Sequence, residues 1–315
     1  MISTKKIEAE DLLTQLIHGL KVVHKYFPHN LIDRDDGKIT EKISFLDEYY
    51  ITRAEVKILT EHINEITSFF SENSVLVEFS SGDYTRTRIL LDHIPDLIAF
   101  IPVDLSEVRL MESAVNLKQE YPNIKINPVI GSLTEKFEMP ETENQFEQKI
   151  IYLPSSKISS LTASELKNFV KNIAKTCGEN GILLIGADLK KNKEIIESAY
   201  NDNKGLTEEL NKNILNYLNE EFGQIFDAEK FGHFVFYNEK MSRAEMYLIS
   251  KTNQLLHIFG NKIFLEKNEK ILTQWFYKYN LSDIEDITYP YFEMNCVWTD
   301  PDNLYSLHLL KVKEI

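Results

Sequence analysis

Between residues 55 and 190, short apolar runs alternate with longer segments in which apolar residues recur every three or four positions. The runs have the length of buried strands, and the longer segments have the period of amphipathic helices. The expected strands are residues 75–80, 97–104, 125–130, 149–153 and 181–188. The expected helices include residues 85–93, 105–120 and 163–176, the last after Ser160–Thr162 as candidate caps. This alternation predicts an α/β fold with a parallel sheet and right-handed crossovers.

The pattern changes after residue 188. A helical period returns at residues 194–200 and 206–222, and strand-like alternation follows at residues 233–250 and 256–279. These segments predict a second, smaller α+β unit.

The last segment predicts an antiparallel hairpin that closes the edge of the first sheet, with strands at residues 295–298 and 304–312. The first 55 residues are mostly helical in pattern. The expected division is therefore a core of residues 56–195 and 286–315 and a second domain of residues 1–55 and 196–285.

The charge balance is acidic, with 49 Asp and Glu against 35 Lys and Arg and a formal net charge of -14. A nucleic-acid partner is not expected, because phosphate backbones require a clustered basic surface. The stretch Lys190–Lys193 is short and precedes Glu194, which favours a solvated helix face. A small molecule is therefore the expected substrate, and the oligomeric state stays open.

Membrane and metal chemistry are also not expected. No stretch approaches the roughly 20 apolar residues that span a bilayer, and the first residues lack the apolar region of a leader, so a cytoplasmic location is expected. Cys177 and Cys296 lie far apart and outside metal-like spacing, which favours two buried thiols over a disulfide or a zinc site. The histidines, His233 among them, show no triad or metal pairing, and we expect them to be satisfied or at the surface.

A candidate cofactor site lies where the first two strands end. Ligands of open α/β sheets bind at the carboxyl ends of strands, where Gly82 lets the backbone approach a ligand. Asp104, at the end of the second strand, is placed to accept hydrogen bonds from two ribose hydroxyls. A single glycine beside the acid Glu78 disfavours a pyrophosphate and suits a cationic sulfonium. This pattern alone leaves an unrelated ligand on a doubly wound fold equally open.

Longer motifs follow one another in an order typical of one enzyme family. They are Asp47–Arg53 (DEYYITR), Leu76–Leu91 (LVEFSSGDYTRTRILL), Pro102–Glu107, Ala199–Asp202 with Gly205–Thr207, Leu210–Asn213, Arg243–Met246 and Trp298–Asp300. Over nearly its whole length the chain thus resembles the histidine-specific, S-adenosylmethionine-dependent N-methyltransferases of ergothioneine biosynthesis. The resemblance implies a Rossmann-like class I methyltransferase core, a smaller α+β substrate-binding domain, and S-adenosylmethionine as cofactor.

The resemblance also implies which residues meet the cofactor. The family's G-S-G loop corresponds to the segment from Ser80 to Gly82, and the lysine that meets the cofactor carboxylate corresponds to Arg86. Both changes are tolerable, because arginine also pairs with carboxylates. The ribose-binding acid is retained as Asp104.

At the adenine the family's Gly-Asp-Phe reads Gly131-Ser132-Leu133, so the Ser132 hydroxyl replaces a charged acceptor and reduced cofactor affinity is expected. A second hypothesis comes from a different class: a catalytically degenerate methyltransferase-fold protein that binds a small molecule. Its motivation is the set of changes at Ser80, Ser132, Ser155 and Ser160. Binding of the cofactor discriminates between the two hypotheses.

On the substrate side, the resemblance implies that Tyr50 and Tyr200 hold the amino-acid backbone of the acceptor, while the family's asparagine corresponds to Ser160. Methyl transfer is an in-line displacement, so the two tyrosines would orient the amine rather than act as general bases. An α-amine with a pKa near 8 loses its proton without a dedicated strong base.

The side-chain pocket departs from the family pattern. The motif T-E-x-S-x-K, whose Glu and Ser bind the imidazole, reads Thr273–Lys278 (TQWFYK) here, so Gln274 and Phe276 stand at those two positions. Charge is lost and bulk is gained, which should disfavour histidine by a few kcal/mol. A two-residue shift of the alignment would remove this argument, and the upstream motif with Met246, a further expected substrate contact, supports the alignment. The leading hypothesis is therefore an N-methyltransferase of a small amino acid or amine other than histidine.

Overall fold

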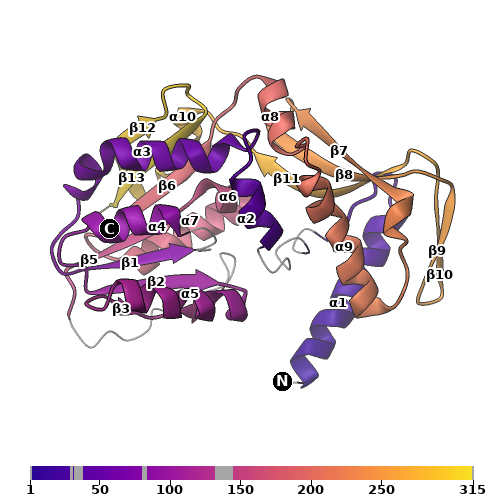
Figure 1. The fold of residues 1–315 in the computed structure, drawn as a ribbon, viewed down its shortest axis with the longest axis horizontal. Coiled ribbons are helices and arrows are strands. Elements are labelled where there is room, and N and C mark those ends of the chain that lie inside the picture. The colour runs from indigo at the N-terminus through magenta and orange to yellow at the C-terminus, as the bar shows by residue number, and fades with distance from the viewer. Residues whose placement is uncertain (1, 29–30, 32–37, 80–83, 132–144, 314–315) are drawn as a thin grey trace. The chain divides into compact units, whose positions relative to one another are not determined.

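The computed structural model describes residues 2–28, 31, 38–79, 84–131 and 145–313 (Figure 1). The chain divides into two compact units, each with its own hydrophobic core. Unit 1 comprises Met1–Tyr49 and Asn192–Phe276, and unit 2 comprises Tyr50–Lys191 and Tyr277–Ile315.

Unit 2 contains a doubly wound sheet with the order β12-β13-β6-β5-β1-β2-β3, in which β4 also pairs with β2. Its strands are β1 (Ser74–Phe79), β2 (Ala99–Asp104), β3 (Lys125–Ile126), β4 (Val129–Ile130), β5 (Gln148–Leu153), β6 (Ile182–Asp188), β12 (Phe292–Thr299) and β13 (Tyr305–Val312). The strands β1, β2, β5 and β6 are parallel, whereas β13 is antiparallel to both β6 and β12. The order switches between β1 and β5, where such sheets bind ligands.

Helices cover this sheet, and every residue of β1, β2 and β6 is buried, as expected for central parallel strands. The helices are α3 (Tyr50–Thr67), α4 (Thr85–His93), α5 (Glu107–Glu120), α6 (Ser155–Ile158), α7 (Ala163–Cys177) and α10 (Leu281–Thr288). The helix α7 begins after Thr162, which forms a capping box with Glu165. It then buries Phe169 edge-on against Phe79 of β1.

The predicted α/β core and the terminal antiparallel hairpin are confirmed. The expected strand at residues 125–130 is instead two short strands, because Pro128 has no N–H for the ladder. The helix α10 was not expected, although the capping box of Asn280 and Asp283 marks its start.

Unit 1 combines a three-stranded sheet, of order β11-β8-β7, with a two-stranded sheet and four α-helices in its described part. Its elements are α1 (Ile2–Lys21), α2 (Lys38–Ser44), α8 (Lys193–Ala199), α9 (Leu206–Phe222), a short 3-10 helix (Ala228–Lys230), β7 (Phe231–Asn238), β8 (Arg243–Ser250), β9 (Gln254–Ile258), β10 (Asn261–Leu265) and β11 (Lys270–Tyr277). The apolar face of α9, with Leu215 and Leu218, joins Phe231 and Leu248 in the core. This is an α+β arrangement.

The boundary between the units falls where α3 begins. The expected boundary at residue 55 lies inside this helix, which runs unbroken from Tyr50 and packs on α4 and β13. Residues 277–285 likewise belong to unit 2. No helix in the described part of the chain is long and apolar enough to cross a membrane.

Candidate active site

Asp104 is the last residue of β2 and is only 5% exposed. Its Oδ1 accepts the backbone N–H of Ser106 at 2.9 Å. Arg109, in the first turn of α5, donates from Nη2 to Oδ1 at 2.8 Å and to Oδ2 at 3.0 Å. The acid predicted to bind the ribose therefore lies at the carboxyl edge of the sheet with an arginine across both of its oxygens.

Arg86 lies on α4 and is nearly buried. Its Nη1 donates to Oε2 of Glu55 at 2.6 Å, and the hydroxyl of Tyr152 donates to Oε1 of the same carboxylate at 2.8 Å. Burial alone would lower the pKa of Arg86, but Glu55 and then Tyr152 raise it above its ordinary value. The buried Nε of Arg86 has no hydrogen-bond partner among the described residues.

The loop and adenine positions are beyond what the structure describes. Ser80, Gly82, Ser132 and Leu133 lie outside the described residues. The described chain reaches Gly131, whose N–H donates to the carbonyl of Asp104 at 3.1 Å. The acid Glu78 is fully buried and accepts from Thr87 of α4 at 2.6 Å, so it joins β1 to that helix.

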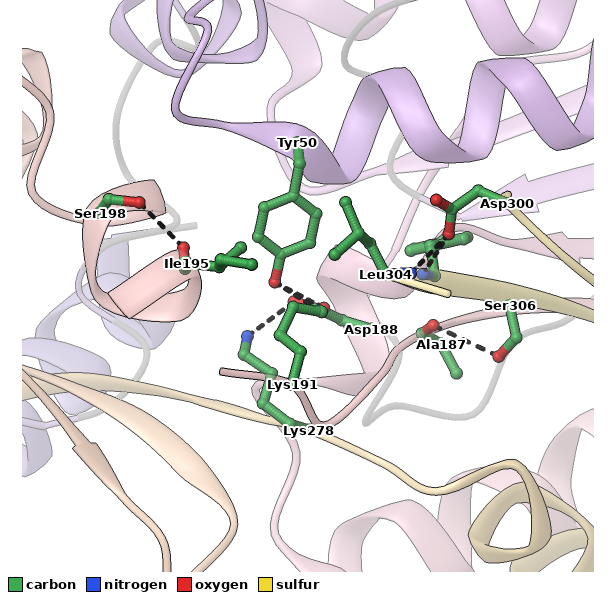
Figure 2. A network of polar contacts seen from close by, with 11 residues as sticks. Tyr50, Ala187, Asp188, Lys191, Ile195, Ser198, Lys278, Asp300, Leu304 and Ser306 are labelled. Atoms are coloured by element: carbon green, nitrogen blue, oxygen red, sulfur yellow. Dashed lines mark hydrogen bonds and ion pairs between the residues drawn. The ribbon is translucent and has the colours of Figure 1, made fainter. Parts of the chain in front are cut away.

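Tyr50, at the start of α3, takes part in a charged network at the end of β6 (Figure 2). Its hydroxyl donates to Oδ1 of Asp188 at 2.8 Å and accepts from Nζ of Lys191 at 2.7 Å. Lys191 also binds Oδ1 of Asp188 at 2.5 Å, and Lys278 binds Oδ2 at 2.7 Å. The hydroxyl of Tyr50 therefore donates to Asp188 and accepts from Lys191 at the same time.

The two lysines of this network are deeply buried, with side chains 6% exposed for Lys191 and 0% for Lys278. Burial lowers the pKa of Lys191 to about 8 although Asp188 opposes the shift, and it lowers the pKa of Lys278 as well. Burial alone would raise the pKa of Asp188, but Lys278 and then Lys191 bring it below its ordinary value. The expectation of a solvated helix face at Lys190–Lys193 is wrong for Lys191, because α8 begins only at Lys193 and the side chain of Lys191 binds Asp188.

Unit 1 brings Tyr200 and Phe276 into direct contact. The two rings stack with centroids 4.6 Å apart and planes 9° from parallel, and Tyr49 meets Tyr200 edge-on at 6.2 Å. His233 bonds the carbonyl of Tyr200 through Nε2 at 2.8 Å and the amide of Asn211 through Nδ1 at 2.9 Å. The expectation of a satisfied histidine is confirmed, and burial lowers its pKa, which favours the neutral ring.

The remaining predicted residues are distributed over both units. In unit 1, Gln274 is 5% exposed, and its Oε1 has no hydrogen-bond partner among the described residues. Met246 is buried, and its carbonyl accepts from Thr273 at 2.9 Å. In unit 2, Ser160 follows α6 and donates to the carbonyl of Lys157 at 3.1 Å.

Sequence reasoning did not single out Glu55, Arg109, Asp188, Lys191 and Lys278 as parts of these networks. A signal existed for Asp188, because it is the acid that ends a buried strand, as Asp104 does. For the others the pairing depends on tertiary structure.

The sheet of unit 2, parallel except for one antiparallel strand next to its edge strand and carrying an acid at the end of β2, is that of a class I methyltransferase. The family model of the "histidine-specific methyltransferase, SAM-dependent" matches residues 12–312, and the chain belongs to this family. It is an S-adenosylmethionine-dependent N-methyltransferase. The predicted family and cofactor are thereby confirmed.

Several relatives are similar over most of their length. The chain is 29% identical over 309 residues to a histidine N-alpha-methyltransferase of Mycolicibacterium smegmatis, which covers 96% of this chain and 95% of that one. It is 30% identical over 262 residues to one from Mycobacterium tuberculosis, covering 81% and 80%. N-methyltransferase imqF of Aspergillus flavus is 22% identical over 281 residues, covering 85% and 75%.

Proposed function

We propose that this enzyme methylates the amino nitrogen of a small amino acid or amine other than histidine. The observation that carries the proposal is the stack of Phe276 on Tyr200. The two rings, with centroids 4.6 Å apart, are in contact, and a third ring between them would need a separation of roughly 7 Å, twice the usual stacking distance. Phe276 therefore places a bulky ring, packed against Tyr200, at the position where the resemblance has the serine that binds the imidazole.

Gln274 supports the same conclusion. It is buried and neutral where the family has an acid, so it offers an imidazolium ring no opposite charge. It offers instead a neutral amide, which suits an uncharged side chain. Losing one charge-assisted contact in a site built on hydrogen bonds costs on the order of 1–3 kcal/mol in discrimination.

The cofactor supplies an activated methyl group, and the residues of this chain align the acceptor and exclude water. For the cofactor we propose Asp104 at the ribose, Arg86 at the carboxylate, Ser80 and Gly82 at the loop, and Ser132 and Leu133 at the adenine. The ion pair with Glu55 keeps Arg86 in place, but it also neutralises part of the charge that Arg86 would present to the cofactor carboxylate.

For the acceptor we propose the contacts that the resemblance implies, from Tyr50, Ser160, Tyr200, Met246, Gln274 and Phe276. The Tyr50 hydroxyl is held in one direction by Asp188 and Lys191, and this fixed hydroxyl would orient the amine. This role is orientation, because an amine with a pKa near 8 gives up its proton in bulk water before it binds.

The test is a methylation panel. The purified protein is incubated with S-adenosylmethionine and each standard amino acid, histamine or another small amine, and added methyl groups are read by mass spectrometry. We expect methylation of at least one acceptor with an uncharged side chain and little of histidine. Efficient trimethylation of histidine would overturn the substrate proposal, whereas absent binding of S-adenosylmethionine in calorimetry would favour the catalytically degenerate small-molecule binding protein.

A further inference from the structure

The carboxylate of Asp104 is already bonded at both oxygens by groups of its own chain. Its Oδ1 accepts from the N–H of Ser106 and from Nη2 of Arg109, and its Oδ2 accepts from the same Nη2. A carboxylate oxygen has two lone pairs in its plane, so Oδ1 is filled. A ribose that presents two hydroxyl donors, one to each oxygen, cannot bind Asp104 while Arg109 stays where it is.

Arg109 is held in this position mainly by Asp104. Its side chain is 24% exposed, whereas that of Asp104 is 4% exposed, so the guanidinium has a route to water. Its Nε is buried and has no hydrogen-bond partner among the described residues. Arg88 is different, because it binds Glu120 through both Nε and Nη2, at 2.8 and 2.9 Å. Arg109 thus uses one nitrogen where a paired arginine uses two.

We propose that Arg109 competes with the cofactor ribose for Asp104 and thereby sets the cofactor affinity of this enzyme. Binding exchanges the ion pair for hydroxyl hydrogen bonds and releases the guanidinium toward solvent. Because Arg109 compensates the charge of Asp104 in the free enzyme, the cofactor can leave without exposing an unpaired buried carboxylate. The exchange therefore favours reversible binding. The proposal depends on the proposed placement of the ribose at Asp104.

The experiment is titration calorimetry with S-adenosylhomocysteine, which needs no methyl acceptor. Arg109→Met keeps much of the aliphatic stem and removes the competitor, so we expect about fivefold tighter binding, the effect of one partly exposed ion pair. Arg88→Met is the matched control, because it removes an exposed ion pair between α4 and α5 and should leave the affinity unchanged. If Arg109→Met does not fold, Arg109→Lys, which loses the planar fork, should give a smaller gain.

Salt supplies a second measurement. Between about 0.05 M and 0.5 M salt, screening weakens the ion pair that must break, so binding to the wild type should tighten relative to Arg109→Met. A purely structural role for Arg109 would give no such difference between the two proteins.

The variant Asp104→Asn distinguishes failure of the proposed competition from failure of the proposed ribose placement. If it weakens binding but Arg109→Met binds equally or more weakly than the wild type, the ribose placement stands and the competition is refuted. If Asp104→Asn binds as the wild type does, the ribose placement itself is wrong and the competition falls with it.

Discussion

Tyr50 and Tyr200 have the same expected task, yet the chain holds them in opposite ways. The hydroxyl of Tyr50 is fixed by charges, between Asp188 and Lys191. The ring of Tyr200 is fixed by other rings, face-on against Phe276 and edge-on against Tyr49. A charged network fixes the direction of a hydrogen bond, whereas stacked rings fix a shape.

The difference indicates where substrate specificity can change. Removing one member of a buried charged network leaves another charge without compensation, so Asp188, Lys191 and Lys278 constrain one another. Replacing Phe276 leaves no buried charge uncompensated, because the stacked pair is neutral and Phe276 is only partly buried. Divergence of the acceptor is therefore expected in the cluster of unit 1 and not in the network of unit 2.

The largest effect should come from breaking the charged network. Asp188→Asn leaves two buried lysines without their carboxylate, and we expect the free energy of unfolding to fall by about 3–5 kcal/mol. Chemical denaturation measures the loss. Glu120→Gln, which breaks the exposed pair with Arg88, should cost less than about 1 kcal/mol. Equal losses of unfolding free energy in the two variants would show that the charged network around Asp188 does not constrain substitution more than an exposed ion pair does.

A smaller effect concerns the pH dependence of stability. The pKa of Lys191 is lowered from 10.5 to about 8 in the folded protein. Between these values the unfolded chain binds a proton that the folded protein does not, so the free energy of unfolding rises with pH across this window. Lys191→Met removes the group and should remove on the order of 1–3 kcal/mol of that rise. A rise identical in both proteins, measured by denaturation from about pH 7 to pH 10, would refute the lowered pKa.

The strands of the sheet could be predicted from the sequence, because burial on both faces leaves a continuous apolar run in each strand. The acids that end β2 and β6 follow from the same rule, since a polar residue directly after such a run lies at the carboxyl edge. The exception at Pro128 has a local cause that is visible in the sequence.

The pairing of side chains could not be predicted in the same way. In the sequence Lys191 has the pattern of a lysine-rich surface stretch, and only the fold of the segment before α8 brings it to Asp188. Arg109 lies five residues from Asp104, but whether a side chain in the first turn of α5 turns back depends on the packing around it. Glu55 on α3 binds Arg86 on α4. The period of apolar residues along one helix does not predict a contact between two helices.

The last prediction acts on the aromatic cluster and is the smallest in free energy. The double change Gln274→Glu with Phe276→Ser restores an acid and empties the space beside Tyr200, so kcat/KM for histidine should rise about tenfold, or about 1.4 kcal/mol. Conversion stays partial because the Ser160 hydroxyl already bonds to the carbonyl of Lys157 and offers less than an asparagine would. Phe236→Ser, at an exposed position of β7, is the control and should leave the acceptor preference unchanged. If the double variant folds normally and its kcat/KM for histidine does not rise, the aromatic cluster of unit 1 does not select the acceptor. The contrast between Tyr50 and Tyr200 would then not explain substrate specificity.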